Sequence, residues 1–270
     1  MTDAVIDWRN PRIVSAVKLH RAPQRRKTGL FLAEGANSVA AALDTERARE
    51  LFYTARAAER EHELVASAVA RGVRATPVSE RAAEHLGETV TPPGLVAVCE
   101  SVDVPLSHVL SDAPRMLAVP VEIADPGNAG TLIRVADAVG ANAVVLAGDS
   151  VDPHNGKCVR ACAGSLFHVP IARERDTGAV LDALAEAGVT VLATTATGEV
   201  DLDDADEILS GPVAWLFGNE AHGLPREVAA RADHRVRIPI HGRAESLNLA
   251  AAAAICLYAS ARVQHREFRS

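Results

Sequence analysis

Three polar, glycine-containing stretches carry the side chains of this sequence that are best suited to chemistry. They are "ADPGNAGT" (124–131), "GNEAHGLP" (218–225) and "HGRAESLN" (241–248). Glycine lets a backbone approach a ligand closely, and the amide, carboxylate and hydroxyl groups beside it donate or accept hydrogen bonds. Arg134 follows the first stretch and adds a permanent positive charge. These residue types suit the binding of a polar, charged ligand.

Each stretch follows an apolar segment that predicts a β-strand. From Met116 onward, predicted strands (116–123, 142–148, 166–171, 189–195, 212–218 and 234–240) alternate with predicted helices (129–140, about 157–163, 178–188, about 203–209, 225–232 and 247–264). Continuously apolar strands separated by helices indicate an α/β fold with a parallel sheet covered on both faces. Ligands bind beyond the carboxyl ends of such strands, so we expect the three stretches to meet there as one site.

The first hundred residues predict a smaller α/β domain. Its expected elements are strands over 30–35, 50–56 and 94–100 and a helix over 57–72. Residues 101–115 mix Pro, Ser and Asp and are the best candidate for a linker, although "PLSHVL" within them is compatible with a short helix. A length of 270 residues is comfortable for two domains. We therefore expect one domain over 1–104 and a second over 105–270.

The charge of the chain is distributed unevenly. The net charge of −7 argues against a protein that coats nucleic acid through its overall charge. Residues 1–30 nevertheless hold seven Lys or Arg and two acids, a local balance of +5. This segment is a candidate for phosphate binding, or the solvated face of an amphipathic helix over 10–22. The candidate RNA-binding side chains within it are Arg9, Arg21, Arg25, Arg26 and Lys27.

Several common classes of protein lack their signatures in this sequence. There is no GxGxxG turn, P-loop, GxSxG elbow or HExxH motif, which disfavours a nicotinamide-dependent dehydrogenase among others. His154, Cys158 and Cys162 share a helical spacing but lack a fourth ligand, so no metal is expected. The four cysteines form no CxxC pair and are expected to be reduced thiols. No apolar run is long enough for a membrane span and no signal peptide is evident, so we expect a cytoplasmic protein.

The three stretches resemble the ordered motifs of a known enzyme family. "NAGTLIR" (128–134), "LFGNEAHGL" (216–224) and "IPIHGRAESLNLAAA" (238–252) are similar to those of the SpoU (TrmH) branch of the SPOUT RNA methyltransferases. The resemblance covers about residues 115–265. The segments "NPRI", "RRKTGLFLAEG" and "TPPGLVAV" resemble, less specifically, the L30e-like substrate-binding domain that precedes this catalytic domain in the ribosomal RNA branch.

The resemblance implies a function and a set of residues. The family transfers a methyl group from S-adenosylmethionine to a ribose 2'-hydroxyl, and its C-terminal domain contains a deep trefoil knot. The matching cofactor positions are Gly218, Ile238 and Leu247, of which the last two are otherwise ordinary core residues. Arg134 matches the catalytic position, and Asn128, Glu220, Ser246 and Asn248 complete the expected catalytic set.

The residues suggest roles for this set. A guanidinium is nearly always protonated, so Arg134 suits stabilisation of the forming alkoxide and a grip on the adjacent phosphate. Glu220 is expected to orient Arg134 or accept a proton. Asn128 and Ser246 are also candidates for helix N-caps, and Glu245 suits a first helical turn.

The predicted protein is thus a ribose 2'-O-methyltransferase of 23S rRNA. The resemblance further implies a homodimer in which Asn128 or Arg134 of one subunit serves the site of the other. Three alternatives stay open: a tRNA 2'-O-methyltransferase, an rRNA methyltransferase that confers self-resistance to an antibiotic, and a catalytically idle RNA-binding protein.

Overall fold

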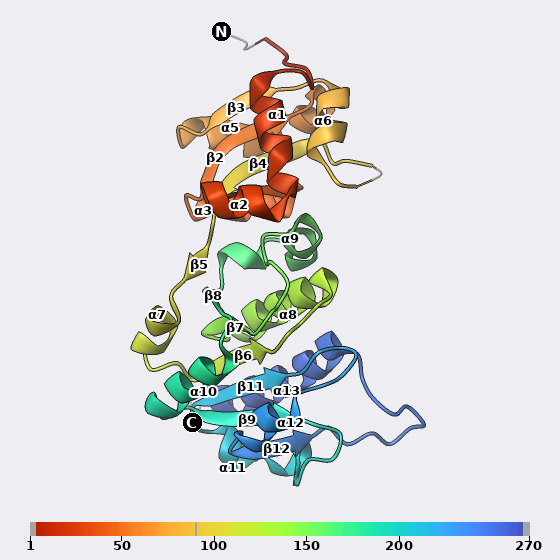
Figure 1. Ribbon diagram of the computed structural model, residues 1–270. Coiled ribbons are helices and arrows are strands. Elements are labelled where there is room, and N and C mark those ends of the chain that lie inside the picture. Colours follow the sequence, from red (N-terminus) through yellow and green to blue (C-terminus); the bar gives the residue numbers. More distant parts are fainter. Residues whose placement is uncertain (1–3, 90, 267–270) are drawn as a thin grey trace. The chain divides into compact units, whose positions relative to one another are not determined.

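The computed structural model describes residues 4–89 and 91–266, which form two compact units (Figure 1). Unit 1 consists of Met1–Val102 and Asp152–His168, and unit 2 of Asp103–Val151 and Val169–Ser270. The first division therefore lies two residues before the predicted domain boundary. The segment 152–168 lies within the predicted second domain, but it packs with unit 1.

Unit 1 is a four-stranded sheet between two layers of helices. The strand order is β1 (Leu30–Glu34), β4 (Leu95–Glu100), β2 (Ala48–Tyr53) and β3 (Arg74–Pro77), with only the last pair parallel. The first layer comprises α1 (Pro11–Val17), η1 (Lys18–His20), α2 (Ala22–Thr28) and α6 (Glu80–Leu86). The second contains α3 (Ala36–Asp44), α4 (Ala55–Arg60) and α5 (His62–Ala70). Ile13, Leu86 and Phe52 are buried together in the core under the first layer.

Local signals explain where these helices begin and end. Asn10 caps α1 by accepting a hydrogen bond from the backbone of Arg12, and Pro11 occupies the first helical position. The single helix predicted over 57–72 is wrong: Glu61 leaves helical geometry (φ −115°, ψ 40°) and divides it into α4 and α5. The strand β3 was not predicted, because its four residues "RATP" show no clear alternation.

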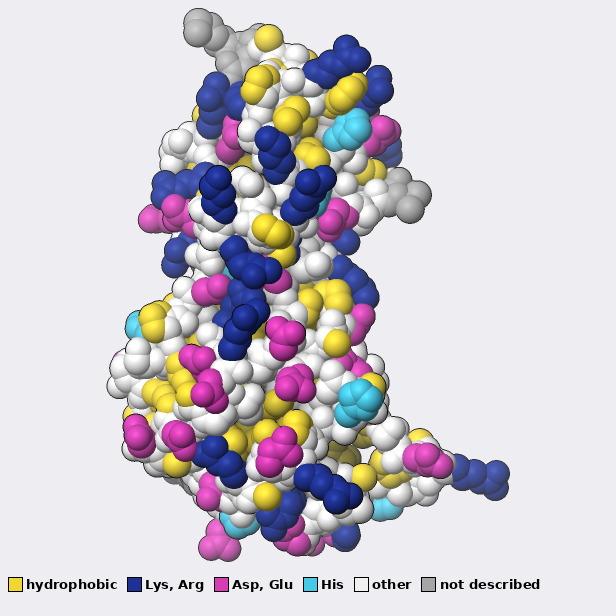
Figure 2. Space-filling view, viewed as in Figure 1, with side chains coloured by type: hydrophobic (Ala, Val, Ile, Leu, Met, Phe, Trp, Pro, Cys, Tyr) yellow, Lys and Arg dark blue, Asp and Glu magenta, His cyan; other side chains and the backbone are white. Residues whose placement is uncertain are grey.

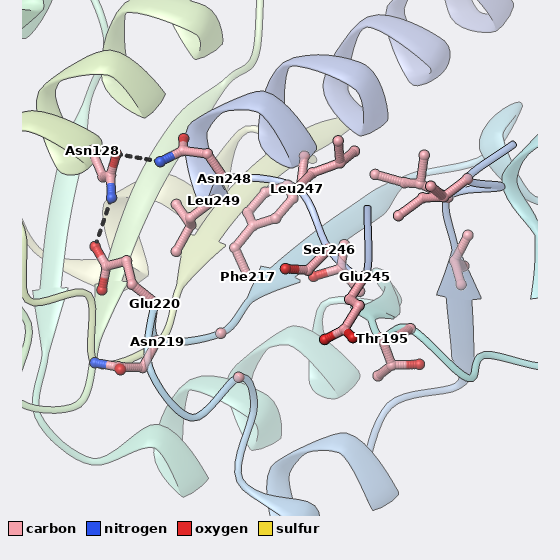
Figure 3. A pocket seen from close by; sticks show the side chains of 18 residues that line it. Asn128, Thr195, Phe217, Asn219, Glu220, Glu245, Ser246, Leu247, Asn248 and Leu249 are labelled. Atoms are coloured by element: carbon pink, nitrogen blue, oxygen red, sulfur yellow. Dashed lines mark hydrogen bonds between the residues drawn. The ribbon is translucent and has the colours of Figure 1, made fainter. Parts of the chain in front are cut away.

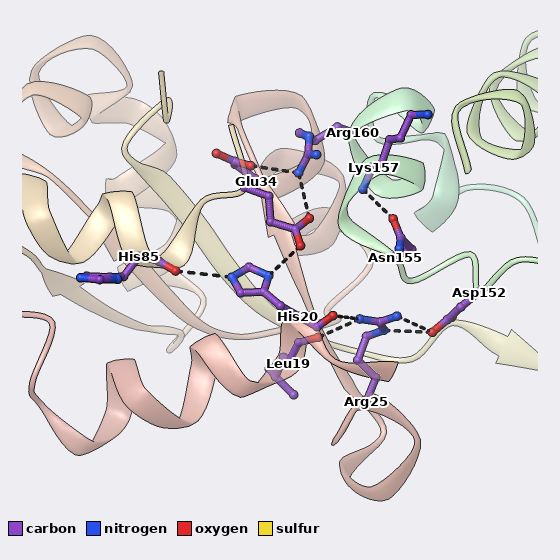
Figure 4. Close-up of polar contacts among 10 residues, drawn as sticks. Leu19, His20, Arg25, Glu34, His85, Asp152, Asn155, Lys157 and Arg160 are labelled. Carbon is purple, nitrogen blue, oxygen red and sulfur yellow. Dashed lines mark hydrogen bonds and ion pairs between the residues drawn. The ribbon is translucent and has the colours of Figure 1, made fainter. Parts of the chain in front are cut away.

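A buried ion pair holds the segment 152–168 in unit 1 (Figure 4). Arg25 is only 7% exposed, and its Nε and Nη2 atoms donate to Asp152 Oδ2 at 2.9 and 2.8 Å. Its Nη1 atom donates to the carbonyl oxygens of Leu19 and His20. Partial burial alone raises the pKa of Asp152, but hydrogen bonds from His154 and Arg25 outweigh it and hold that pKa well below its usual range.

The placement of Arg25 corrects one of the expected RNA contacts. The Nε, Nη1 and Nη2 atoms of Arg25 all donate hydrogen bonds to oxygen atoms of the protein. Its guanidinium therefore stabilises unit 1 and does not bind an RNA phosphate. The segment that it holds contains α9 (Gly156–Cys162) and η2 (Ser165–Phe167). Arg160 of α9 adds contacts with Glu34 at 3.4 Å and Glu88 at 3.3 Å.

Unit 2 is built on an eight-stranded, entirely parallel sheet. The sequence predicted a parallel sheet but not its two short edge strands, Asp103–Val104 and Val200–Asp201. The strand order is β10 (Val200–Asp201), β12 (His234–Arg237), β9 (Thr190–Thr194), β11 (Val213–Phe217), β6 (Met116–Pro120), β7 (Ala143–Ala147), β8 (Ile171–Glu174) and β5 (Asp103–Val104). The trefoil knot implied by the family resemblance stays a prediction, because strand order does not specify how the chain is threaded.

Helices cover both faces of this sheet. One face packs against α7 (Leu106–Ser111), α10 (Thr177–Glu186) and α12 (Arg226–Ala230). The other face carries α8 (Pro126–Val139), η3 (Leu202–Asp204), α11 (Asp206–Leu209) and α13 (Leu249–Arg266), and α8 lies against α13. The indole of Trp215, fully buried in β11, donates to Ser260 of α13 at 2.8 Å.

Two local predictions for unit 2 differ from the structure. The strand expected over 166–171 is wrong, because Ser165–Phe167 forms a 3₁₀ turn and the strand begins at Ile171. The expected linker 101–115 contains β5 and α7, so most of it belongs to the folded unit. Within the described residues, all four cysteines are buried and free, no metal-binding cluster occurs, and no helix could cross a membrane.

Replacing Arg25 by Met should destabilise the protein by about 3 kcal/mol, because it leaves the carboxylate of Asp152 partly buried without its guanidinium partner. Urea unfolding measures the loss, and Arg26→Met is the matched control because Arg26 is exposed. The lowered pKa of Asp152 means that the ion pair contributes above the ordinary pKa of 3.8 and is lost at lower pH. The difference between the Arg25→Met protein and the native protein should therefore shrink on acidification. Equal stability of the two variants at neutral pH would contradict this role.

Candidate functional site

The carboxyl edge of the parallel sheet in unit 2 holds a cavity of about 500 Å³. It is lined by residues from all three polar stretches: Asn128, the segment 217–220 after β11, and the segment 245–248 before α13. A fourth segment, 194–196 after β9, completes the lining and was not singled out from the sequence. Because β12, β9, β11 and β6 are neighbours in the sheet, the loops that follow them meet at one place.

A chain of side-chain hydrogen bonds joins the three stretches across the cavity (Figure 3). Asn128 donates from Nδ2 to Glu220 Oε1 at 3.1 Å, and Asn248 donates from Nδ2 to Asn128 Oδ1 at 3.2 Å. Glu220 also accepts from the backbone N–H groups of Ala124 and Asp125. The amide of Asn128 is therefore oriented by a partner on each side.

The helix caps beside the cavity differ from those expected. Asp125, not Asn128, caps α8, and its carboxylate accepts from the backbone N–H of Asn128 at 2.9 Å. Asn248, not Ser246, caps α13 by accepting from the backbone N–H of Ala250 at 2.9 Å. Glu245 precedes α13 and does not belong to its first turn. Asn128 and Ser246 are thus free of capping duties and line the cavity.

The environment of Glu220 fixes it as a carboxylate. Partial burial raises its pKa, but the hydrogen bonds from Asn128 and from backbone N–H groups together lower it below the usual value. A carboxylate with a lowered pKa accepts hydrogen bonds well and is a weak proton acceptor. The geometry supports an orienting role for Glu220, directed at Asn128 where the sequence suggested Arg134.

The loop after β11 owes its shape to a glycine and an asparagine. A Cβ atom on Gly218 would lie 2.2 Å from the carbonyl carbon of Gly223, so the loop folds back directly over Gly218. Asn219 closes the turn through two backbone hydrogen bonds with Gly223 and donates from Nδ2 to the carbonyl of Glu122 at 2.7 Å. Glu122 has a left-handed backbone (φ 54°), a conformation that its surroundings must hold in place.

Both apolar and polar side chains line the cavity. Ile238 and Leu247, which the resemblance placed at the cofactor, both line it, and Leu247 is 38% exposed. Leu247 is therefore no core residue. Ile240 is similarly exposed, while Phe217 and Leu249 form the buried part of the lining. The hydroxyl oxygen of Thr195 is buried in the same lining and has no hydrogen-bond partner within the described residues.

The remaining expected residues are not among those that line this cavity. Arg134 is exposed on α8 and is not part of the cavity lining. Arg9, Arg21, Arg26 and Lys27 are exposed in unit 1. The sequence analysis missed Asp125, Thr195 and Asn219, although Asn219 stands between Gly218 and Glu220, which it did select.

Comparison with known proteins assigns the family. The family model described as the SpoU rRNA Methylase family matches residues 115–258, and the MRM3-like substrate binding domain matches residues 10–97. The chain belongs to the SpoU rRNA methylase family. It is 34% identical to the Bacillus subtilis 23S rRNA (guanosine(2553)-2'-O)-methyltransferase RlmP, over 93% of this chain and 96% of that protein. The 23S rRNA (uridine(2479)-2'-O)-methyltransferase of Streptomyces viridochromogenes is 33% identical, over 88% and 85%.

Solved structures of SpoU proteins extend this similarity to both units. An AdoMet-bound rRNA methyltransferase from Sinorhizobium meliloti is 35% identical with a TM-score of 0.83, covering 97% of each chain. AviRb from Streptomyces viridochromogenes, in complex with AdoMet, is 31% identical with a TM-score of 0.80, covering 94% of this chain and 98% of its own. A third solved structure, described as "Structural insights into the 2-OH methylation of C/U34 on tRNA", is 32% identical with a TM-score of 0.52, covering 57% of this chain and 99% of its own.

Replacing Gly218 by Ala should weaken the binding of S-adenosylmethionine about 10-fold or more, because the added methyl group would push the loop at Gly223 outward. Isothermal titration measures the affinity. Gly242→Ala is the matched control, since no atom lies within 4 Å of the position where its Cβ would be. If both variants bound the cofactor equally well, the loop would not depend on Gly218.

Proposed function

We propose that this chain transfers a methyl group from S-adenosylmethionine to a ribose 2'-hydroxyl of 23S rRNA. The observation that carries the proposal is the hydrogen-bonded chain Glu220–Asn128–Asn248 at the edge of the cavity. In a SpoU protein whose solved relatives bind AdoMet, this arrangement suits a cofactor cavity with a polar rim for a ribose.

The cavity fits S-adenosylmethionine on three counts. Its volume of about 500 Å³ lies in the range of small-molecule sites. Ile238 and Leu247 offer apolar surface to an adenine ring, and the unsatisfied hydroxyl of Thr195 offers a hydrogen bond. When bound, the cofactor supplies a methyl group on an electron-deficient sulfur.

The residues at the rim have distinct roles in the proposed reaction. The transfer would form a bond between the methyl group and the ribose oxygen and break the methyl–sulfur bond, and the hydroxyl proton would pass to water. The oxygen carries negative charge as its proton leaves, and a nearby cation stabilises that charge. Arg134 supplies that cation and binds the neighbouring phosphate. Asn128, held by Glu220 and Asn248, orients the ribose, and Ser246 offers a further hydrogen bond from the exposed segment before α13.

The position of Arg134 supports a homodimer with shared sites. Arg134 does not line the cavity of its own chain, but it is exposed on α8, which packs beside α13. The outer face of α13 exposes two large side chains, Ile255 at 40% and Tyr258 at 66%. An apolar helix face of this kind suits burial against a second copy. We therefore place Arg134 at the cavity of the partner subunit.

The choice of 23S rRNA over tRNA rests on unit 1. RlmP and the Streptomyces viridochromogenes enzyme, two relatives that span both units, are named for 23S rRNA, whereas the structure named for tRNA methylation matches little more than half of the chain. Exposed Arg9, Arg21, Arg26 and Lys27 of unit 1 would contact the RNA. From this substrate we infer a cytoplasmic location.

Replacing Arg134 by Ala should abolish methylation and leave cofactor affinity nearly unchanged, because Arg134 does not line the cavity. The assay uses radiolabelled S-adenosylmethionine with 23S rRNA, 16S rRNA and tRNA from a host that lacks the gene. Arg226→Ala removes another exposed arginine of unit 2 and should retain activity. Full activity of the Arg134→Ala protein would refute the assigned role, and absence of label on every RNA would refute the proposed function.

Mixing two inactive proteins tests the shared site. Each shared cavity would combine Glu220 of one subunit with Arg134 of the other. In a dimer of one Arg134→Ala and one Glu220→Ala subunit, one cavity would therefore carry both substitutions and the other would carry neither. Activity should recover to about one quarter of the native value, since half of randomly paired dimers are mixed and each has one intact site. No recovery after the subunits have exchanged would place Arg134 at its own subunit's cavity.

A further inference from the structure

Unit 1 carries an aromatic and cationic cluster that none of the motifs includes. The guanidinium carbons of Arg9 and Arg81 lie 4.7 and 4.8 Å from the centre of the Trp8 ring. The ring of His85, one turn after Arg81 on α6, lies 5.2 Å from the same indole at an interplanar angle of 34°. Trp8 is half-buried, whereas Arg9, Arg81 and His85 are exposed. We call these four residues the Trp8 cluster.

The chain around Trp8 is held in place by hydrogen bonds. The backbone N–H of Ile6 donates to the carbonyl of Pro77 at 3.0 Å, and that of Ser79 donates to the carbonyl of Ile6 at 3.0 Å. The hydroxyl of Ser79 also donates to Asp7 at 2.6 Å. Ile6 and Trp8 pack on the core beneath α1 and α6. The indole is therefore fixed before any partner arrives.

The two guanidinium groups of the cluster differ from several other arginines of unit 1. Arg12, Arg49 and Arg71 each form an ion pair with a carboxylate. Within the described part of the chain, Arg9 and Arg81 contact the indole of Trp8. Their interaction with the carboxylate of Asp7 is a longer-range electrostatic attraction and not an ion pair. Guanidinium groups that lie on an aromatic ring without a carboxylate partner leave their donors and planar faces to a ligand.

The cluster shares a layer with the basic residues of the N-terminal segment. Trp8 and α6 adjoin α1, and the exposed side chains of Lys18, Arg21, Arg26 and Lys27 follow on η1 and α2. Figure 2 shows Lys and Arg side chains gathered over this part of unit 1. The acids Asp7, Glu80 and Glu84 lie beside the cluster itself, so its local charge is nearly balanced. Phosphate attraction thus belongs to η1 and α2, and the cluster is suited to something less charged.

We propose that the Trp8 cluster is a stacking site for an unpaired nucleobase of the RNA substrate. The inference rests on the proposed function for its ligand class, since single-stranded RNA is recognised by stacking on aromatic rings and guanidinium planes. An RNA strand whose phosphates lie along η1 and α2 presents a splayed base to Trp8, Arg9, Arg81 and His85. Base stacking there gives unit 1 a preference for unpaired over duplex RNA.

Binding of two short RNAs to the full-length protein tests this inference. A 12-nucleotide oligoadenylate offers unpaired bases, and a 12-base-pair duplex offers phosphates with its bases hidden. Stacking should quench the emission of Trp8 with the oligoadenylate only, and the other tryptophan, Trp215, is fully buried in unit 2. The same quenching by the duplex would overturn the inference.

Matched variants locate the interaction. Trp8→Ala should weaken oligoadenylate binding about 10-fold and Arg81→Gln about 3-fold, and both effects should persist at high salt because stacking releases no counterions. Arg56→Gln is the matched control, because it makes the same change of charge at an exposed position of α4, in the other helix layer. This variant should not weaken oligoadenylate binding at high salt. If Trp8→Ala perturbs the fold, Arg81→Gln still tests the site, because this variant retains the ring of Trp8. Equal effects of Arg81→Gln and Arg56→Gln would refute the stacking site.

This binding assay is independent of catalysis. Salt-resistant, Trp8-dependent binding by a protein that methylates no RNA would support the stacking site and refute the proposed function. Methylation of 23S rRNA by a protein that lacks such binding would support the function and refute the stacking site.

Discussion

The amide of Asn128 is the point on which the candidate site depends. It accepts a hydrogen bond from Asn248, 120 residues away in sequence, and donates one to Glu220, 92 residues away, and so joins three loops. Each partner is also tied to a helix end: Glu220 to the backbone that precedes α8, and Asn248 to the first turn of α13. An amide with one donor and one acceptor engaged has a fixed orientation. Its remaining hydrogen-bonding capacity therefore points in a defined direction.

One residue beside the candidate site has a costly backbone conformation. Glu122, two residues after β6, is left-handed, and its carbonyl accepts a hydrogen bond from Asn219. Asn219 lies in the loop that folds over Gly218, where a Cβ atom would collide with the returning chain. The glycine is needed for contact between two parts of the protein. This differs from the simpler expectation that Gly218 makes room for the cofactor alone.

The sequence predicted those features that follow from local patterns. Apolar runs such as Val213–Phe217 predicted the parallel sheet, and strand ends predicted which polar loops meet. Features that depend on tertiary contacts were missed. Arg25 looks like its exposed neighbours in the sequence, and only the folded position of Asp152 shows that it is buried. Likewise, "LFHV" has the composition of a strand, but the left-handed Gly164 before it starts a 3₁₀ turn. Thr195 has no motif of its own and reaches the cavity because β9 lies between β12 and β11.

Hydrogen bonds in the C-terminal half of α13 explain how Asn248, at the N-terminal end of this helix, is held in position. Apolar packing alone tolerates small shifts of a helix along its axis, whereas buried hydrogen bonds do not. Gln264 donates to the carbonyl oxygens of Arg115, Leu209 and Gly211, and Ser260 accepts from the indole of Trp215. These polar contacts fix α13 against the strands and loops of the sheet, well over two turns from Asn248. Because the helix is continuous and rigid, anchoring its C-terminal half also positions the amide of Asn248 beside Asn128. The outer face with Ile255 and Tyr258 takes no part in this anchoring, so it remains available to a second subunit without disturbing the site.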